Sequence, residues 1–415
     1  MTWTGEWVEA RLGVRPAGEG LRDLVGLAVR RNPRRAHLLV STVLGKHVPT
    51  DPALVYGSGL RLGGLVRDLT VEDALVVGYA ETATALGHAV ADALGGAYYL
   101  HSTRRPVPGF ATYGGFEEEH SHATSHLLLP ADPAELDRDA PLVLVDDELS
   151  TGRTVLNTIR ALHAVRPRAR YVVAALVDLR DDASRAATRA LAGELGARID
   201  TVALATGRVE LPDGVLEAGR ALVAEVERHS AGPVRTGAFP VTRADLAWPE
   251  GLPDGGRHGF LPEHRLRLEK ELPGMAGRLA ASLPGAAARV LVLGFEELMY
   301  VPLRLAGAVA DLLPGADVRY STTTRSPVLA VDDPGYAIRT RLVFPAHDGP
   351  ADGPGERYAY NVDPGRDPAR AFDAIVLVVD DVGDTPALAD GLLARLRALA
   401  PVTLAAVPAR RKESL

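Results

Sequence analysis

The sequence has no cysteine among its 415 residues, which excludes disulfides, thiolate nucleophiles and cysteine-ligated zinc. It also lacks an uninterrupted apolar run near the roughly 18 residues that a membrane helix needs. Residues 1–10 have no apolar core of the kind found in signal peptides. We therefore expect a cytoplasmic enzyme or sensor with no membrane partner.

Basic residues are not in excess, because the net charge is −7. A nucleic-acid-binding protein would normally carry a basic surface, so we expect no nucleic-acid partner. Lysine is especially scarce and occurs at Lys46, Lys270 and Lys412. Against so many arginines, Lys46 is a candidate functional residue, since its compact ammonium differs from a planar guanidinium.

Short apolar runs alternate with helical patterns through the first half of the chain. The predicted strands are 73–78, 97–100, 142–145 and 171–177, and the predicted helices are 83–94 and 154–165. Residues 21–47 are predicted to be a helix followed by a mixed segment. Continuous apolar strands alternating with helices indicate an α/β fold with a parallel sheet covered on both faces.

The length predicts more than one domain, and the composition divides the chain into three parts. We predict an N-terminal domain at 1–228, a connector rich in proline and glycine at 229–285, and a second domain at 286–415. The connector shows little periodicity, yet it is too long to be only a tether.

The second half repeats features of the first in the same order. The matched segments are 75–81 with 290–297, 102–107 with 323–328, 126–130 with 341–345, and 142–147 with 376–381. Four ordered matches favour a duplicated fold. The alternative is that parallel α/β units resemble one another at this level of detail.

The most informative local pattern is VLVDDELSTGRT at residues 143–154. An apolar strand ends in Asp146 and Asp147, and a short loop with glycine and hydroxyl residues leads into a helix. Unpaired N–H groups at a helix start favour an anion, and Gly152 lets the backbone approach a phosphate closely. Two acids beside that cradle are suited to the hydroxyl groups of a ribose. The alternative is a strand followed by a capped helix start.

This pattern resembles the motif with which type I phosphoribosyltransferases bind 5-phosphoribosyl-1-pyrophosphate (PRPP). The resemblance implies that Asp146 and Asp147 hold the ribose hydroxyls and act in catalysis. It also implies a phosphate cradle made of Ser150, Thr151, Gly152, Arg153 and Thr154. Mg²⁺ would be the cofactor, held mainly by PRPP itself, with Asp146 and Asp147 as candidate ligands.

The resemblance extends to other segments. It implies a pyrophosphate-binding loop at Gly78, Tyr79, Ala80 and Glu81, often with a strained or cis peptide, and a basic pair at Arg104 and Arg105. A mobile catalytic loop would span 108–124, with His120 and His122 as catalytic candidates and His126 close by. This loop departs from the family pattern because it lacks lysine and is acidic at 117–119. Lys46 and His47 lie where the family builds a hood over the acceptor base.

The whole chain resembles the phosphoribosyltransferases fused to a TRSP-type domain that are associated with tellurium-resistance-type stress gene clusters. The second half keeps two acids at Asp380 and Asp381 but lacks the phosphate cradle, so we expect a degenerate copy that does not bind PRPP. Residues 257–259 and Arg325 are candidates to reach into a shared pocket.

We therefore expect an enzyme that transfers a phosphoribosyl group between PRPP and a small base-like acceptor. Its role would be the synthesis or salvage of a nucleoside-like metabolite, and a homodimer is a candidate assembly. The alternatives are a PRPP-binding sensor without catalysis, since fold does not fix function, and a scaffold whose second half binds a partner protein.

Overall fold

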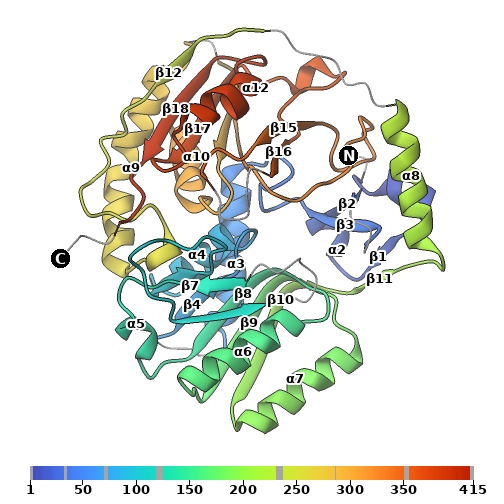
Figure 1. Ribbon diagram of the computed structural model, residues 1–415, viewed down its shortest axis with the longest axis vertical. Coiled ribbons are helices and arrows are strands. Elements are labelled where there is room, and N and C mark those ends of the chain that lie inside the picture. The colour runs from blue at the N-terminus through green and yellow to red at the C-terminus, as the bar shows by residue number, and fades with distance from the viewer. Residues whose placement is uncertain are drawn as a thin grey trace.

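The computed structural model describes seven stretches of the chain. They are 3–31, 35–69, 73–117, 125–229, 237–285, 287–349 and 355–411. No helix within these stretches has the length and apolar character needed to cross a membrane. Two parallel sheets, one in each half of the chain, form the framework (Figure 1).

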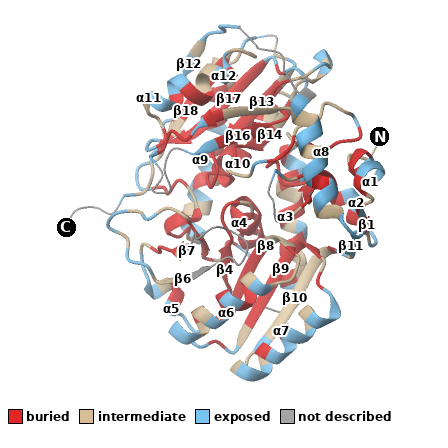
Figure 2. Ribbon diagram, turned by 45° about the vertical axis from the view of Figure 1, so that its right-hand side comes forward, coloured by how far each residue is buried: buried red, intermediate tan, exposed pale blue. Residues whose placement is uncertain are grey.

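The first sheet contains five parallel strands in the order β10-β9-β8-β4-β5. Its strands are β4 (Leu75–Gly78), β5 (Tyr99–His101), β8 (Leu142–Leu149), β9 (Arg170–Asp178) and β10 (Arg198–Thr206). The apolar runs predicted as strands are buried in this sheet, as Figure 2 shows in red. Four helices accompany it: α3 (Pro52–Arg67), α4 (Thr84–Ala93), α6 (Arg153–Val165) and α7 (Asp182–Leu195). Helices α3 and α4 lie between the two sheets, whereas α6 and α7 lie on the outer side (Figure 1).

The second sheet has the strand order β12-β18-β17-β13-β14. Its parallel strands are β12 (Val241–Arg243), β13 (Arg289–Gly294), β14 (Asp317–Thr322), β17 (Ala374–Asp380) and β18 (Val402–Val407). Strands β18-β17-β13-β14 follow the same chain order as β9-β8-β4-β5 in the first sheet. The predicted fold of two similar parallel-sheet domains is therefore confirmed.

Corresponding hydrogen bonds recur in the two halves. The Ala80 N–H donates to the Ser102 hydroxyl at 2.9 Å, and the Glu296 N–H donates to the Thr323 hydroxyl at 3.1 Å. Each half also has an antiparallel hairpin between its second and third core strands. The hairpins are β6 (Gly114–Glu117) with β7 (Ser125–Leu128), and β15 (Arg341–Pro345) with β16 (Glu356–Tyr360).

One of the four matches between the halves is wrong in detail. The sequence pattern pairs 126–130 with 341–345, but the first segment lies mainly in β7 and the second in β15. Thr103 pairs with Leu127 of β7, whereas the corresponding Thr324 pairs with Tyr358 of β16. The counterpart of β7 is therefore β16, and a similar run of apolar residues before a proline caused the mismatch.

The two halves exchange short segments at the edges of their sheets. Tyr320 in the edge strand β14 pairs with Thr50, just before α3. Tyr99 in the edge strand β5 pairs with Phe260, just before α9 (Pro262–Ser282). Helix α10 (Tyr300–Leu312) contacts α3, α4 and α9. Each half thus covers the open sheet edge of the other.

Two parts of the chain differ from the sequence-based prediction. Residues 21–47 form only one helical turn, α2 (Leu21–Leu24), followed by the hairpin of β2 (Val25–Val29) and β3 (His37–Ser41). Val25, Gly26 and Val29 have low helix propensity, which favours the strand. The predicted connector contains the long helix α9 and contributes β12 to the second sheet. Pro273 inside α9 obscured its helical pattern, because proline is rare in helix interiors. The boundaries of the three predicted parts stay predictions.

Smaller elements complete the described part of the chain. They are α1 (Glu6–Leu12), β1 (Arg15–Ala17), α5 (Ala134–Asp137), β11 (Arg208–Glu210), α8 (Val215–His229), α11 (Pro386–Leu388), α12 (Ala394–Leu396), the 3-10 turns Gly256–His258 and Pro368–Arg370, and a π-helical turn at Ala389–Leu393. Strands β1 and β11 pair beside the β2–β3 hairpin and α2 (Figure 1).

Candidate functional site

A cavity of about 640 Å³ lies at the carboxyl ends of β4 and β8. This is where open α/β sheets bind ligands. Three groups of residues line it: residues 146–155 after β8, the loop 79–82 after β4, and residues of the segment 30–47. Arg104 and residues 325–327 complete the lining. Segments far apart in the sequence therefore meet around one cavity.

The segment after β8 has the form of a phosphate cradle. Strand β8 continues through the acids to Leu149, further than predicted, and α6 begins at Arg153. Gly152 precedes the helix with a φ of 73°, a conformation that residues with a Cβ atom rarely adopt. A Cβ atom there would also come within 2.9 Å of the Arg180 side chain. The backbone can thus approach a ligand closely at this helix start.

The two acids of this segment line the cavity and are partly exposed. The Asp147 N–H donates to the Asp146 carboxylate at 2.9 Å, which fixes the direction of the first side chain. The next residue, Glu148, also lines the cavity, although no sequence pattern singled it out. Burial and the charge of Asp147 raise the pKa of Glu148 to about 7, although Arg35 and Arg30 act in the opposite direction.

Residues outside the cavity lining hold the loop after β4 in place. The Ala80–Glu81 peptide bond is cis, a feature that the family resemblance led us to expect here. The Ser102 hydroxyl accepts from the Ala80 N–H and lies 2.8 Å from Nδ1 of His126. His126 is fully buried and does not line the cavity. It supports the loop that lines the cavity, instead of facing a ligand itself.

Lys46 and His47 both reach the cavity. Lys46 donates from Nζ to the Thr82 hydroxyl at 2.6 Å, so it lies beside the loop 79–82. Burial, with the charges of Lys46 and Arg30, holds the pKa of His47 well below its ordinary value. Lys46 therefore lies on the side of the cavity formed by the loop 79–82, whereas His47 lies on the side formed by the hairpin.

The predicted basic pair is split between two environments. Arg104 lines the cavity, and its N–H donates to the Glu297 carboxylate at 3.1 Å. Arg105 does not line the cavity, because its guanidinium forms an ion pair with Asp348 and lies 3.8 Å from Asp380. Buried carboxylates of the second half thus hold Arg105 outside the cavity lining, and its predicted contact with PRPP stays a prediction.

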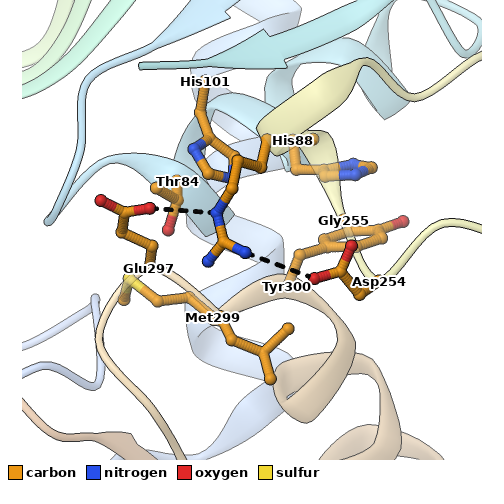
Figure 3. A pocket seen from close by; sticks show the side chains of 11 residues that line it. Thr84, His88, His101, Asp254, Gly255, Glu297, Met299 and Tyr300 are labelled. Atoms are coloured by element: carbon orange, nitrogen blue, oxygen red, sulfur yellow. Dashed lines mark hydrogen bonds and ion pairs between the residues drawn. The ribbon is translucent and has the colours of Figure 1, made fainter. Parts of the chain in front are cut away.

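The acids of the second half are neutralised by arginines. Asp380, the counterpart of Asp146, is 1% exposed and lies 3.6 Å from Arg257. Figure 3 shows the carboxyl groups of Glu297 and Asp254 on either side of one guanidinium, that of Arg257. Ligand hydroxyls would have to displace these guanidinium groups to reach Asp380.

The residues expected to reach a shared pocket divide in the same way. Arg257 belongs to the buried cluster just described, and the ring of the neighbouring His258 is bonded to the Leu129 carbonyl at 2.8 Å. Neither lines the cavity, whereas Arg325 does, held by Glu296 at 2.6 Å. His120 and His122 lie outside the described residues.

Two comparisons with protein families agree with this geometry. Residues 24–208 match the family model described as phosphoribosyl transferase, and residues 254–396 match the TRSP domain that lies C-terminal to it. The chain belongs to the phosphoribosyltransferases that carry a TRSP domain. It is thus a phosphoribosyltransferase enzyme in the general sense. No curated protein matches the chain.

Several solved structures resemble part of this TRSP-containing phosphoribosyltransferase. An APRTase from Giardia lamblia with 9-deazaadenine is 16% identical, with a TM-score of 0.33, over 44% of this chain and 93% of that one. An adenine phosphoribosyl transferase from Trypanosoma brucei is 13% identical, with a TM-score of 0.33, over 45% and 78%. A hypoxanthine phosphoribosyltransferase from Staphylococcus aureus is 12% identical, with a TM-score of 0.23, over 33% and 69%. Because these values are low, the family assignment rests on the two family models.

Proposed function

We propose that the cavity binds PRPP with Mg²⁺ and transfers its phosphoribosyl group to a nitrogen of a base-like acceptor, or catalyses the reverse reaction. The observation that supports this most is the joint lining of one cavity by residues 146–154, the loop 79–82 and the β2–β3 hairpin. The product would be a nucleoside-like metabolite, in the stress-related context that the family resemblance implies.

The reaction breaks the bond from the ribose C1 atom to pyrophosphate and forms a bond from C1 to the acceptor nitrogen. Asp146 and Asp147 would accept hydrogen bonds from the ribose hydroxyls. The N–H groups and hydroxyls of residues 150–154 would hold the 5-phosphate at the start of α6. The loop 79–82 would bind the pyrophosphate, whose negative charge Arg104 would help to stabilise. Lys46, which donates to Thr82 of this loop, stays a predicted acceptor-side residue together with His47.

The cavity fits a magnesium ion that PRPP itself binds. Mg²⁺ prefers oxygen ligands and often uses only one or two carboxylates together with substrate phosphates, and Asp146 and Asp147 offer such carboxylates. Within the described stretches, no group of three metal-ligating side chains was found. When bound, the ion would neutralise charge on the leaving pyrophosphate.

Calorimetric titration with PRPP, with and without Mg²⁺, tests this proposal. We expect one site per chain, with tighter binding in the presence of Mg²⁺. The double variant Asp146→Asn with Asp147→Asn should lose at least roughly tenfold in affinity, since each charge-assisted hydrogen bond contributes about 1.5–3 kcal/mol. Asp213→Asn with Asp390→Asn removes two exposed acids and serves as the matched control.

The possible results test separately what we propose for the N-terminal half and what we predict for the C-terminal half. Unchanged affinity in the Asp146 and Asp147 variant, or no binding at all, contradicts the assignment of the cradle. A second PRPP site would contradict the prediction that the C-terminal half does not bind PRPP. Consumption of PRPP with a panel of acceptors then distinguishes an enzyme from a sensor. A homodimer and a cytoplasmic location stay predictions from the sequence.

A further inference from the structure

Glu81 is an acid in the loop that we propose to bind pyrophosphate. It lines the cavity and directly follows the cis peptide bond. The residue is 7% exposed, and none of the described residues forms a hydrogen bond with its buried Oε1 atom. A buried carboxylate oxygen without a partner is unfavourable. A ligand that supplies a partner for this oxygen would remove that cost.

The second half of the chain has a glutamate at the same position, but with its partners in place. Corresponding backbone hydrogen bonds align Glu297 with Glu81. The Glu297 carboxylate accepts from the Thr103 hydroxyl at 2.8 Å and from Nε of Arg257 at 3.3 Å. Protein groups thus satisfy Glu297, whereas within the described stretches none bonds to Oε1 of Glu81. The difference indicates that the partner of Glu81 is a bound ligand.

A second carboxyl group lies close to Glu81. The charge of Glu81 raises the pKa of Glu296, after the larger effect of burial, while nearby arginines lower it. Arg325 and Arg357 each bond to Glu296 at 2.6 Å. Glu81 therefore stands beside a like charge, and further negative charge at this place would be repelled.

The other charges of the cavity do not remove this repulsion. Among the described residues, six arginine or lysine side chains and four carboxylates line the cavity. Asp146 and Asp147 are assigned to the ribose hydroxyls, and Glu148 faces two arginines of the hairpin. The surplus of basic groups suits the phosphates of PRPP. It gives no reason for an acid in the loop that would hold the pyrophosphate, unless a divalent cation lies between the two.

We propose that Glu81 binds the Mg²⁺ ion that PRPP or pyrophosphate carries into the cavity. Mg²⁺ commonly takes one or two carboxylates, with phosphates and waters as its other ligands. No three metal-ligating side chains converge within the described stretches, so the ion would arrive with the pyrophosphate instead of occupying a site of its own. This inference rests on the proposed function and adds a metal-binding residue to it.

Calorimetric titration with pyrophosphate, with and without Mg²⁺, tests the inference. In the wild-type protein, we expect Mg²⁺ to strengthen the binding of pyrophosphate. Glu81→Gln should lower this gain roughly tenfold or more, the loss typical when a group that supports a bound metal is removed. The same variant should bind pyrophosphate without Mg²⁺ more tightly than the wild type does, because one like charge is gone.

The opposite signs of these two effects separate metal binding from other roles of Glu81. A structural role would weaken binding both with and without Mg²⁺ and would lower the urea midpoint of unfolding. A protonated Glu81 that donates to pyrophosphate would be replaced well by the amide, so the gain from Mg²⁺ would not change. Glu217→Gln alters an exposed glutamate on α8 and should leave both affinities as they are.

The outcomes distinguish this inference from the proposed function. If neither PRPP nor pyrophosphate binds to the wild-type protein, both fail. If PRPP binds but Mg²⁺ gives no gain for pyrophosphate, only the role of Glu81 is contradicted. The same holds if Glu81→Gln keeps the full gain, or loses affinity equally with and without Mg²⁺.

Discussion

Glu297 offers the sharpest test of how the two halves are joined. The residue is 4% exposed, and its carboxylate accepts from the Thr103 hydroxyl at 2.8 Å, the Arg104 backbone N–H at 3.1 Å and Nε of Arg257 at 3.3 Å. Glu297→Gln preserves the shape and one oxygen acceptor but removes the charge opposite Arg257. Breaking a buried ion pair costs about 3–5 kcal/mol.

The lower end of that range is expected here, since Arg257 keeps two other carboxylates at 3.6 and 3.7 Å. Urea unfolding followed by tryptophan fluorescence should therefore show a loss of about 3 kcal/mol at neutral pH. Glu250→Gln, which changes an exposed glutamate, is the control. A loss below about 1 kcal/mol, the value typical of an exposed pair, would refute the reasoning.

The pH dependence of this difference has a defined sign. Burial alone would raise the pKa of Glu297, but the charges of Arg257 and Arg105 outweigh it and hold the pKa well below the ordinary value of 4.5. A carboxyl with a depressed pKa stabilises the folded protein above its unfolded value and loses this effect as the pH falls. The stabilities of the wild type and Glu297→Gln should therefore converge as the pH falls below 4.5.

Three further predictions concern other parts of the chain. Gly152→Ala should weaken PRPP binding roughly tenfold in calorimetry, because a residue with a Cβ atom pays about 1–2 kcal/mol to adopt the left-handed backbone conformation. Gly193→Ala is the control and should leave binding unchanged, because a Cβ atom at that position meets nothing within 4 Å. Arg105→Met should lower the unfolding free energy by about 3 kcal/mol but weaken PRPP binding less than Arg104→Met does, and the reverse order would contradict our placement of the pair. Burial lowers the pKa of His101 from 6.5 to about 4, so the folded protein keeps it neutral and loses stability as the pH falls from 6.5 toward 4. His101→Gln should lessen that loss, as measured by urea unfolding at several pH values, and an unchanged pH profile would count against this assignment.

The segment that we propose as a phosphate cradle could be picked out because its parts are contiguous in the sequence. Strand, acids, glycine and helix start follow one another within residues 143–154, so local chemistry alone indicates a ribose-phosphate site. The loop 79–82 could be predicted from its place after a buried strand. In both cases the sequence signal is local, although tertiary hydrogen bonds from Ser102 and Lys46 hold the loop 79–82 in its place.

Other features depend on contacts between distant segments and could not be predicted. Arg104 and Arg105 are neighbours with the same chemistry, yet carboxylates of the C-terminal half direct only the second away from the cavity. Glu148 gains its environment from arginines of the hairpin, for which the sequence pattern indicates a helix and a mixed segment. Such placements follow from tertiary packing and not from local pattern.

The exchange of edge segments also bears on how the protein is made. While the chain is being synthesised, β5 remains an uncovered sheet edge until Phe260 has left the ribosome. Uncovered edges can pair with other chains and lead to aggregation. A ribosome that stalls between the two halves would therefore release an N-terminal fragment that contains all of residues 143–154. In this fragment the edge of β5 would be exposed and able to pair with other chains. The N-terminal half produced alone would expose the same edge of β5 and would be prone to aggregate for the same reason.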